Sequence, residues 1–197
     1  MQFISVLFHP MLMPTLTYVI VYLFLPEIIK PLGLITLPFL FVTTFLIPLL
    51  SISVLKYTSN ISSLTLENRE ERLIPFIFVA VFYAITSYMF VYKVRVNPVV
   101  GVMLVSTTVL IILLTIITLF EKISIHSAGM SGVVGFLIVF ALKYPDSTVL
   151  YPLLVMIVLA GLVMTSRLYL NAHTPREIFS GFLVGFTVCF GMLYLLD

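Results

Sequence analysis

Two histidines of this chain each stand at the start of a long apolar run. His173 follows Arg167 by six positions and precedes Glu177 by four. Histidine serves as a nucleophile or a proton donor, and arginine presents a planar fork of N–H groups that matches phosphate oxygens. Glu177, about one helical turn after His173, is placed to hold the imidazole in one tautomer. This stretch is therefore a candidate site for phosphate chemistry.

The same stretch carries the signal of a helix start. Thr174 is a good N-cap, Pro175 suits the first helical position, and Glu177 falls three residues after the cap. A capping box at a membrane surface explains these residues without any chemistry, but it explains neither Arg167 nor His173. A helix N-terminus also attracts phosphate through its free N–H groups and its dipole. Both interpretations of Glu177 remain open at this point.

The second histidine, His126, begins another apolar run. Ser124 lies two residues before it, and Gly129, Gly132 and Gly135 follow. Small residues let membrane helices pack closely, and we expect these glycines to do so. A lone histidine at a membrane edge is often only interfacial. Two histidines at helix starts on the same side of a membrane indicate a shared site.

A third polar segment, residues 66–75, holds five of the eighteen charged residues of the chain. Arg69 and Arg72 precede an apolar run on the same side as the histidines, which makes them candidate phosphate ligands. The alternative is a solvated loop in which arginine and glutamate side chains pair at helical spacing, with little effect on stability. For Glu67 and Glu70 the two interpretations are equally good.

The composition requires a membrane. Hydrophobic residues make up 61% of the 197 residues and charged residues 9%, with a mean hydropathy of +1.24. Soluble domains are about 45–50% apolar and about 25% charged. A chain of 22.2 kDa has too little interior to bury so much apolar surface, so lipid must cover it. A soluble enzyme, a disordered tail and a disulfide scaffold are thereby excluded, and the net charge of +2 does not indicate nucleic acid as a partner.

Seven apolar runs approach the length of about 20 residues that a membrane-spanning helix needs. The first is interrupted by His9, Pro10 and Pro14, so its front half is expected in the interface, and His9 is interpreted as structural or interfacial. We predict an all-α integral membrane protein, one transmembrane domain over residues 1–197 with a bundle of six to seven transmembrane helices. The runs cover residues 3–25, 33–55, 75–92, 98–120, 124–142, 148–166 and 178–196.

The links between these runs fall into two groups. Three short links carry Lys30, Lys93, Arg95 and Lys143, and three longer links carry the polar residues described above. Two spans separate each long link from the next, so all three should lie on one face of the membrane. Lysine and arginine in short loops mark the cytoplasmic side. We therefore expect the candidate site on the outer, periplasmic face of a bacterial inner membrane.

With these residues in place, the chain resembles the type 2 phosphatidic acid phosphatase superfamily of membrane phosphatases. The third motif of that family is Ser-Arg, five residues, His, three residues, then Asp. Ser166, Arg167, His173 and Glu177 match its spacing, with glutamate in place of aspartate. The resemblance covers about residues 67–185, the part of the chain that carries the motifs.

The other two motifs match less closely. The second is Pro-Ser-Gly-His, of which Ser124 and His126 remain. The first, Lys, six residues, then Arg-Pro, has no direct counterpart, and Arg69 or Arg72 would take the role of the lysine in a variant phosphate clamp. The helix after the third motif carries two glycines that also look like those of the family's last helix, Gly181 and Gly185.

The resemblance implies a metal-independent phosphate ester or anhydride hydrolase without a cofactor. His173 would attack phosphorus and form a phosphohistidine, Glu177 would orient His173, and His126 would protonate the leaving oxygen. The remaining site residues would bind the phosphate oxygens, namely Arg167, Arg69, Arg72 and Ser124. Candidate substrates are polyprenyl pyrophosphate, phosphatidylglycerol phosphate, phosphatidic acid or a lipid A phosphate, with the lipid tail in the bilayer and the phosphate at its surface.

Two other classes of function are open. The incomplete match to the first and second motifs favours a catalytically weak or inactive relative that binds or moves a phospholipid. The retained histidines and Arg167 argue against this hypothesis. A small transporter would place ionisable residues and broken helices within its spans. The spans of this chain are nearly free of charge, which makes a transporter the weakest of the three hypotheses.

Overall fold

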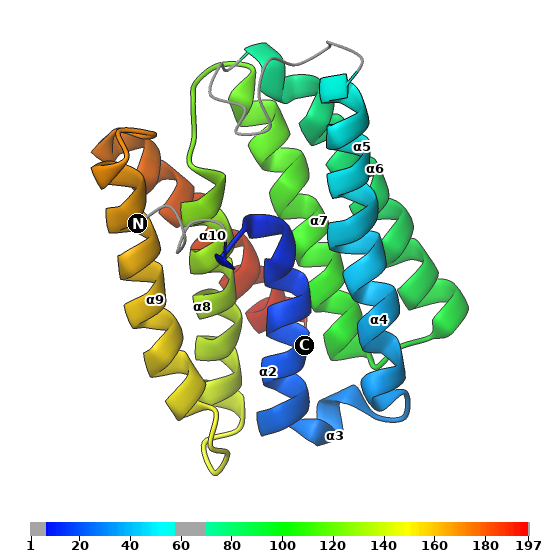
Figure 1. Ribbon diagram of the computed structural model, residues 1–197. Coiled ribbons are helices and arrows are strands. Elements are labelled where there is room, and N and C mark those ends of the chain that lie inside the picture. The colour runs from blue at the N-terminus through cyan, green and yellow to red at the C-terminus, as the bar shows by residue number, and fades with distance from the viewer. Residues whose placement is uncertain (1–6, 58–69, 197) are drawn as a thin grey trace.

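The computed structural model describes residues 7–57 and 70–196, and this part of the chain is helical without any strand (Figure 1). The elements in chain order are η1 (Pro10–Leu12), α2 (Met13–Phe24), α3 (Pro26–Ile29), η2 (Gly33–Ile35), α4 (Thr36–Phe41), η3 (Val42–Leu46), α5 (Ile47–Tyr57), η4 (Glu70–Arg72), α6 (Leu73–Tyr88), η5 (Met89–Val94), α7 (Pro98–Thr118), α8 (Ile125–Lys143), α9 (Leu150–Tyr169) and α10 (Pro175–Leu196). The turns η3 and η5 are π-helical and continue the helices beside them.

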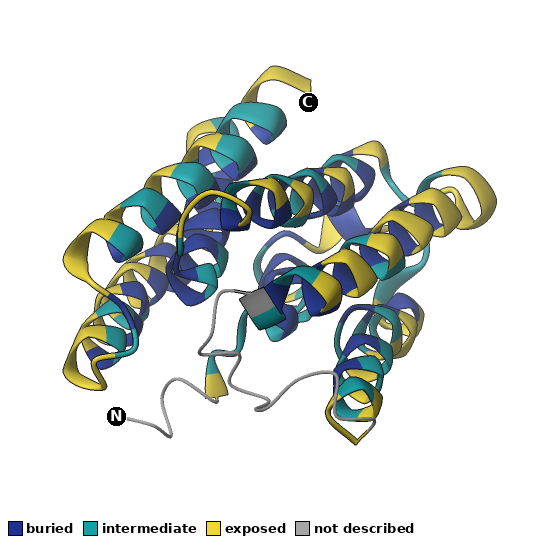
Figure 2. Ribbon diagram, turned by 90° about the horizontal axis from the view of Figure 1, so that it is seen from above, coloured by how far each residue is buried: buried dark blue, intermediate teal, exposed yellow. Residues whose placement is uncertain are grey.

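Six helical segments of the described chain are long and apolar enough to cross a membrane, which confirms the predicted all-α membrane bundle. They are Gly33–Tyr57, Leu73–Val94, Pro98–Thr118, Ile125–Lys143, Leu150–Tyr169 and Pro175–Leu196. Figure 2 shows exposed residues on the outward faces of these helices and buried residues on the inward faces. Because the exposed residues include many large apolar side chains, the outer surface suits lipid.

Within the described residues, the first apolar run does not make a seventh span. Its helical part is a short 3-10 turn followed by the 12 residues of α2, and these 12 residues rise only about 18 Å. The hydrocarbon core of a bilayer is about 30 Å thick. The run is divided because Pro10 begins the 3-10 turn and Pro14 falls at the first turn of α2. In Figure 1, α2 accordingly covers only part of the height of the bundle.

Helix α8 lies at the centre of the bundle. Of its most apolar stretch, 72% is buried inside the protein, against 28–50% for the other five spans. Its three predicted packing glycines all face neighbouring helices: Gly135 lies against the backbone of α10, Gly132 against Cys189 of α10, and Gly129 against Pro10 of η1. A Cβ at these positions would meet those atoms at 2.9–3.3 Å. The prediction that the glycines permit close packing is confirmed.

The start of α10 approaches the start of α8 even more closely. A Cβ at Gly181 would clash with the carbonyl oxygen of Ser124, and one at Gly185 would clash with the carbonyl oxygen of Ala128. Side chains this small let two helix backbones touch, which is a main source of helix association in membranes. The contact brings the first turns of α8 and α10 side by side.

The described parts of the three long links lie at one end of the bundle, at the top of Figure 1. The guanidinium Nη1 of Arg72, in the first link, donates to the backbone oxygen of Ile123 in the second link at 3.3 Å. Arg176, in the third link, forms an exposed ion pair with Glu121 of the second link at 3.3 Å. The prediction that these links share one face is therefore confirmed, whichever way the chain is inserted.

The α8–α10 contact predicts a large difference between two glycines of the same helix. Gly185→Ala pushes a methyl group into the backbone of α8, and overpacking of this kind costs about 1–3 kcal/mol or more. At Gly191 no atom lies within 4 Å of the position that a Cβ would take, so Gly191→Ala should leave stability unchanged or raise it slightly. Thermal unfolding in detergent, followed by size-exclusion chromatography, measures both. Equal midpoints for the two variants would contradict the packing described here.

Candidate active site

The spacing between Arg167 and His173 is set by the way α9 ends. The backbone N–H of Asn171 donates to the oxygen of Leu168 at 2.9 Å, and the N–H of Ala172 donates to the oxygen of Arg167 at 3.1 Å. With Asn171 at φ 50°, these two bonds form a Schellman motif, in which asparagine is a common alternative to glycine. The chain thus reverses within a few residues, and His173 returns next to the helix end that carries Arg167.

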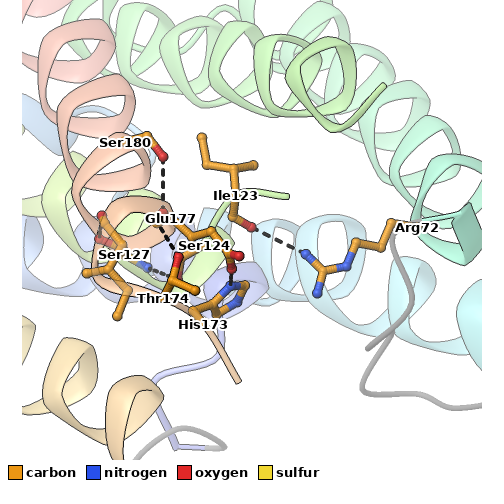
Figure 3. A network of polar contacts seen from close by, with 9 residues as sticks. Arg72, Ile123, Ser124, Ser127, His173, Thr174, Glu177 and Ser180 are labelled. Carbon is orange, nitrogen blue, oxygen red and sulfur yellow. Dashed lines mark hydrogen bonds and ion pairs between the residues drawn. The ribbon is translucent and has the colours of Figure 1, made fainter. Parts of the chain in front are cut away.

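His173 and Glu177 are paired across the first turn of α10. Nδ1 of His173 lies 2.6 Å from Oε2 of Glu177. Thr174 caps the helix as predicted, because its hydroxyl accepts the backbone N–H of Glu177 at 3.3 Å. The backbone of Glu177 therefore belongs to the helix cap while its carboxylate contacts the imidazole, so the two interpretations of Glu177 are compatible. Figure 3 shows this pair at the centre of the polar network.

The contact with Glu177 fixes the tautomer of His173. An ionised carboxylate accepts hydrogen bonds only, so Nδ1 carries the proton and Nε2 keeps its lone pair. Burial lowers the pKa of His173 to about 4; the Glu177 hydrogen bond raises it, and the charges of Arg72 and Arg167 lower it. The lowering effects prevail because only 2% of the imidazole side chain is exposed and two cations act on it. At neutral pH, His173 is an uncharged base whose Nε2 can accept a proton or attack phosphorus.

The start of α8 is tied to this pair through the backbone of α10. The N–H of Ser124 donates to the oxygen of Glu177 at 3.1 Å, and the hydroxyl of Ser127 donates to the oxygen of Ile178 at 2.7 Å. Figure 3 shows Ser124 and Ser127 beside the start of α10. These bonds hold the first turn of α8, which carries His126, against that helix start. Ser124, a predicted phosphate ligand, is fully buried and its hydroxyl caps α8 by accepting the N–H of Ser127 at 3.4 Å.

Of the predicted arginines, Arg72 and Arg167 both lie close enough to His173 to act on its charge, and Arg167 also acts on that of Arg72. Arg72 is 5% exposed and reaches toward the second link from the side opposite His173 (Figure 3). Burial lowers the pKa of its guanidinium, while the negative charge of Glu177 raises it. Arg69 lies outside the described residues.

A cavity of about 700 Å³ opens beside these residues, within the range of about 300–1,000 Å³ that ligand pockets occupy. It reaches Tyr83 on α6 and Phe136 on α8, about three turns from the starts of these helices. Most of this inner part is apolar. At the end formed by the links, the cavity is lined by three cationic side chains and no carboxylate among the described residues. These cations are Arg72, Lys122 and Arg167.

His126 and His173 both lie near this end of the cavity, but they differ in whether they line it. His126 lines the cavity, whereas His173 does not line it and follows the lining residue Ala172 in the chain. A phosphate in the cavity therefore meets the cations and His126 first, and contact with Nε2 of His173 requires a rearrangement of the site, because only 2% of the imidazole side chain is exposed. Catalytic contacts commonly tighten only when substrate is bound.

At the end formed by the links, three further lining residues carry polar groups to which the sequence patterns gave no role at the site, namely His9, Lys122 and Asn171. Asn171 could have been found from its position just after α9, where asparagine tolerates a left-handed backbone. Lys122 lies four residues before His126, a signal visible in the sequence. His9 had no such signal, because only the fold brings η1 beside α8. In residues 7–57 and 70–196, no three His, Cys, Asp or Glu side chains gather in a way that could hold a metal ion.

Comparison with protein-family models, with curated proteins and with solved structures gives no significant match to this chain.

The electrostatics around His173 predict its titration. Because burial and two arginines disfavour the protonated form, the imidazole should stay neutral as pH falls below 6.5 and take up a proton only near pH 4. Arg72→Ala removes one opposing charge and should raise this pKa. Arg176→Ala is the matched control, since Arg176 is exposed and contacts Glu121 instead. Nitrogen-15 NMR of labelled histidine in detergent reports the titration, and a wild-type midpoint near 6.5 would refute this description of the site.

Proposed function

We propose that this protein is a membrane-embedded phosphatase that hydrolyses a lipid phosphate or pyrophosphate through a phosphohistidine on His173. The observation that carries the proposal is the His173–Glu177 pair at 2.6 Å, with Arg72 and Arg167 acting on the same imidazole. A neutral imidazole with one nitrogen fixed by a carboxylate is an activated nucleophile. Two arginines beside it suit the negative charge of a phosphoryl group in transfer.

In the first step, Nε2 of His173 attacks phosphorus and the bond between phosphorus and the leaving oxygen breaks. The electron pair of that bond goes to the leaving oxygen, which takes a proton from His126. The imidazole becomes positively charged while Nδ1 keeps its proton, and the carboxylate of Glu177 stabilises this charge. Arg72 and Arg167 bind the phosphoryl oxygens throughout, so most of the catalysis is positioning and charge stabilisation.

In the second step, water attacks the phosphorus of the phosphohistidine. His126, now neutral, accepts the proton of the water, and the bond between phosphorus and Nε2 breaks with its electron pair returning to the nitrogen. Inorganic phosphate is released and both histidines regain their starting protonation. All atoms of this sequence come from the substrate, one water molecule and the two histidines, so no further reactant enters it.

The shape of the cavity supports an amphiphilic substrate. Its cationic end offers three positive charges to a phosphate or diphosphate headgroup, and its apolar inner part extends about three helical turns into the bundle. An apolar surface of this kind suits a hydrocarbon chain. The substrate tail would then lie at least partly inside the protein and not wholly in the surrounding bilayer.

The proposed orientation puts the site on the outer, periplasmic side of a bacterial inner membrane. The short links carry Lys30, Lys93, Arg95 and Lys143, and such residues mark the cytoplasmic side. A cysteine introduced at Asn171 should react with an impermeant thiol reagent in intact cells, whereas one introduced at Lys93 should react only after lysis. Because Cys189 is buried but lines the cavity, both cysteines are introduced into Cys189→Ala protein. The opposite labelling pattern would reverse the orientation.

A second candidate function is binding of a phospholipid without turnover, by a catalytically weak or inactive relative of the phosphatases. One observation favours it: the imidazole of His173 is 2% exposed and does not line the cavity. Purified protein that binds lipid phosphates but releases no phosphate from any of them would support this second function against the first.

The two histidines are predicted to respond differently to the leaving group. His173→Ala should abolish phosphate release from both a lipid phosphate and an activated aryl phosphate, because no covalent intermediate can form. His126→Ala should lose about 10²–10⁴-fold on the lipid phosphate, and much less on the aryl phosphate, whose leaving group needs little protonation. Release should persist with a metal chelator. The assay is phosphate release by purified protein from both substrates.

Arg176→Ala serves as the control for general effects of substitution near the site, since its side chain is exposed and outside the cavity. It should keep wild-type rates. Turnover by His173→Ala, or an equal loss on both substrates in His126→Ala, would show that the assigned roles are wrong.

The inner cavity gives a prediction for chain length. Val79 on α6 lines the cavity and is 5% exposed, whereas Val81 on the same helix is 50% exposed and does not line it. Val79→Phe fills part of the space for a tail and should raise KM for a long-chain phosphate by about fivefold to a hundredfold, since overpacking costs about 1–3 kcal/mol. KM for a short soluble phosphate should change little. Val81→Phe should change neither. Equal KM values for Val79→Phe and Val81→Phe would place the tail elsewhere.

A further inference from the structure

The described chain brings a third histidine, His9, to the cavity. His9 lies just before η1, and its ring packs edge to face against that of His126, with centroids 5.6 Å apart and planes at 78°. Both rings line the cavity together with Arg167. His9 comes from outside the three long links, so no motif around His126 or His173 accounts for it.

The position of η1 is fixed from two sides. Gly129 of α8 lets Pro10 approach closely, since a Cβ there would meet Pro10 at 3.3 Å. From the other side, the hydroxyl of Tyr83 on α6 donates to the backbone oxygen of Met11 at 3.5 Å, a long hydrogen bond. The start of η1 therefore lies at the cavity, and these two contacts hold His9 beside His126.

The protonation of His9 follows from its contact with the backbone. Nδ1 accepts the N–H of Met11 at 3.4 Å, so in the neutral ring the proton is on Nε2. Burial, and secondarily the positive charge of Arg167, lower the pKa of His9 to about 4. His9 is thus a neutral ring whose Nε2–H is a hydrogen-bond donor, next to a group proposed to transfer a proton.

We propose that His9 is a substrate-binding residue whose Nε2–H donates to a phosphate oxygen on the His126 side of the cavity. This inference rests on the proposed function for the identity of the ligand. The three cationic side chains at this end of the cavity attract the phosphate by their positive charge. His9 would add a hydrogen-bond donor and no further charge. The competing explanation is that His9 only caps η1 and packs on His126.

Three substitutions separate these explanations. His9→Asn places an amide oxygen near the position of Nδ1 and keeps the cap, but its side chain is too short to reach the position of Nε2. His9→Gln places its amide nitrogen near the position of Nε2 and loses the cap. His9→Phe keeps the ring against His126 and has no donor.

The measurement is the Kd of inorganic phosphate for each purified protein by isothermal titration calorimetry, with KM and kcat for a lipid phosphate and the thermal midpoint alongside. A lost donor to a charged ligand should weaken phosphate binding about tenfold to a hundredfold in His9→Asn and His9→Phe. His9→Gln should stay within about threefold of the wild type. The loss should appear in KM more than in kcat, at an unchanged thermal midpoint in His9→Phe.

The opposite order, with His9→Asn like the wild type and His9→Gln impaired, would overturn the inference in favour of a capping role. Equal affinity in all three variants would also overturn it. Wild-type protein that binds phosphate without hydrolysing any lipid phosphate would remove the proposed function, while the ranking of the variants still decides the role of His9. Wild-type protein that binds no phosphate would overturn both.

Discussion

The contact between the first turns of α8 and α10 is the constraint on which the candidate site depends. Gly181 and Gly185 let the backbone of α10 touch that of α8, and the bonds from Ser124 and Ser127 to α10 fix the register. Each helix carries one histidine at its start. Because a membrane bundle is held mainly by close packing and hydrogen bonds between helices, a slide of one helix along the other would separate these histidines and break the polar contacts together.

Burial and charge then define the chemistry of the site. A carboxylate at 2.6 Å fixes the imidazole of His173, and two arginines together with burial keep it neutral. The cations are held at the end of the bundle where the links meet. Three cationic side chains line this end of an otherwise largely apolar cavity, and positive charge gathered in a cleft with apolar walls attracts anions. This arrangement supports the proposal that a phosphate group binds there.

Much of the fold could be predicted from the sequence, since six of the seven apolar runs form the expected spans and the three long links share one face. The signals were strong because length and hydropathy alone decide whether a helix can span a membrane. The signal for the helix cap at Thr174 was also contained in a few neighbouring residues. The first run was harder to predict, because its prolines shorten the helix by an amount that composition does not reveal.

The candidate site was less predictable, because it depends on contacts between distant segments. Ser124 matched a motif, yet its hydroxyl is used to cap α8. His9 looked interfacial, and only the packing of η1 against Gly129 brings it to His126. Lys122 lies four residues before His126, but this spacing alone does not distinguish a side chain that lines a cavity from one in a solvated link. Which side chains line a cavity follows from tertiary packing and not from local pattern.

The central claim is that phosphate is transferred to Nε2 of His173. Its most direct test is to quench purified protein during turnover of a lipid phosphate labelled with phosphorus-32, and to locate the label by mass spectrometry at alkaline pH. A phosphoramidate on His173 that is absent from His173→Ala is the predicted result. Phosphate release at the wild-type rate without any labelled protein, or with the label on another residue, would contradict the claim.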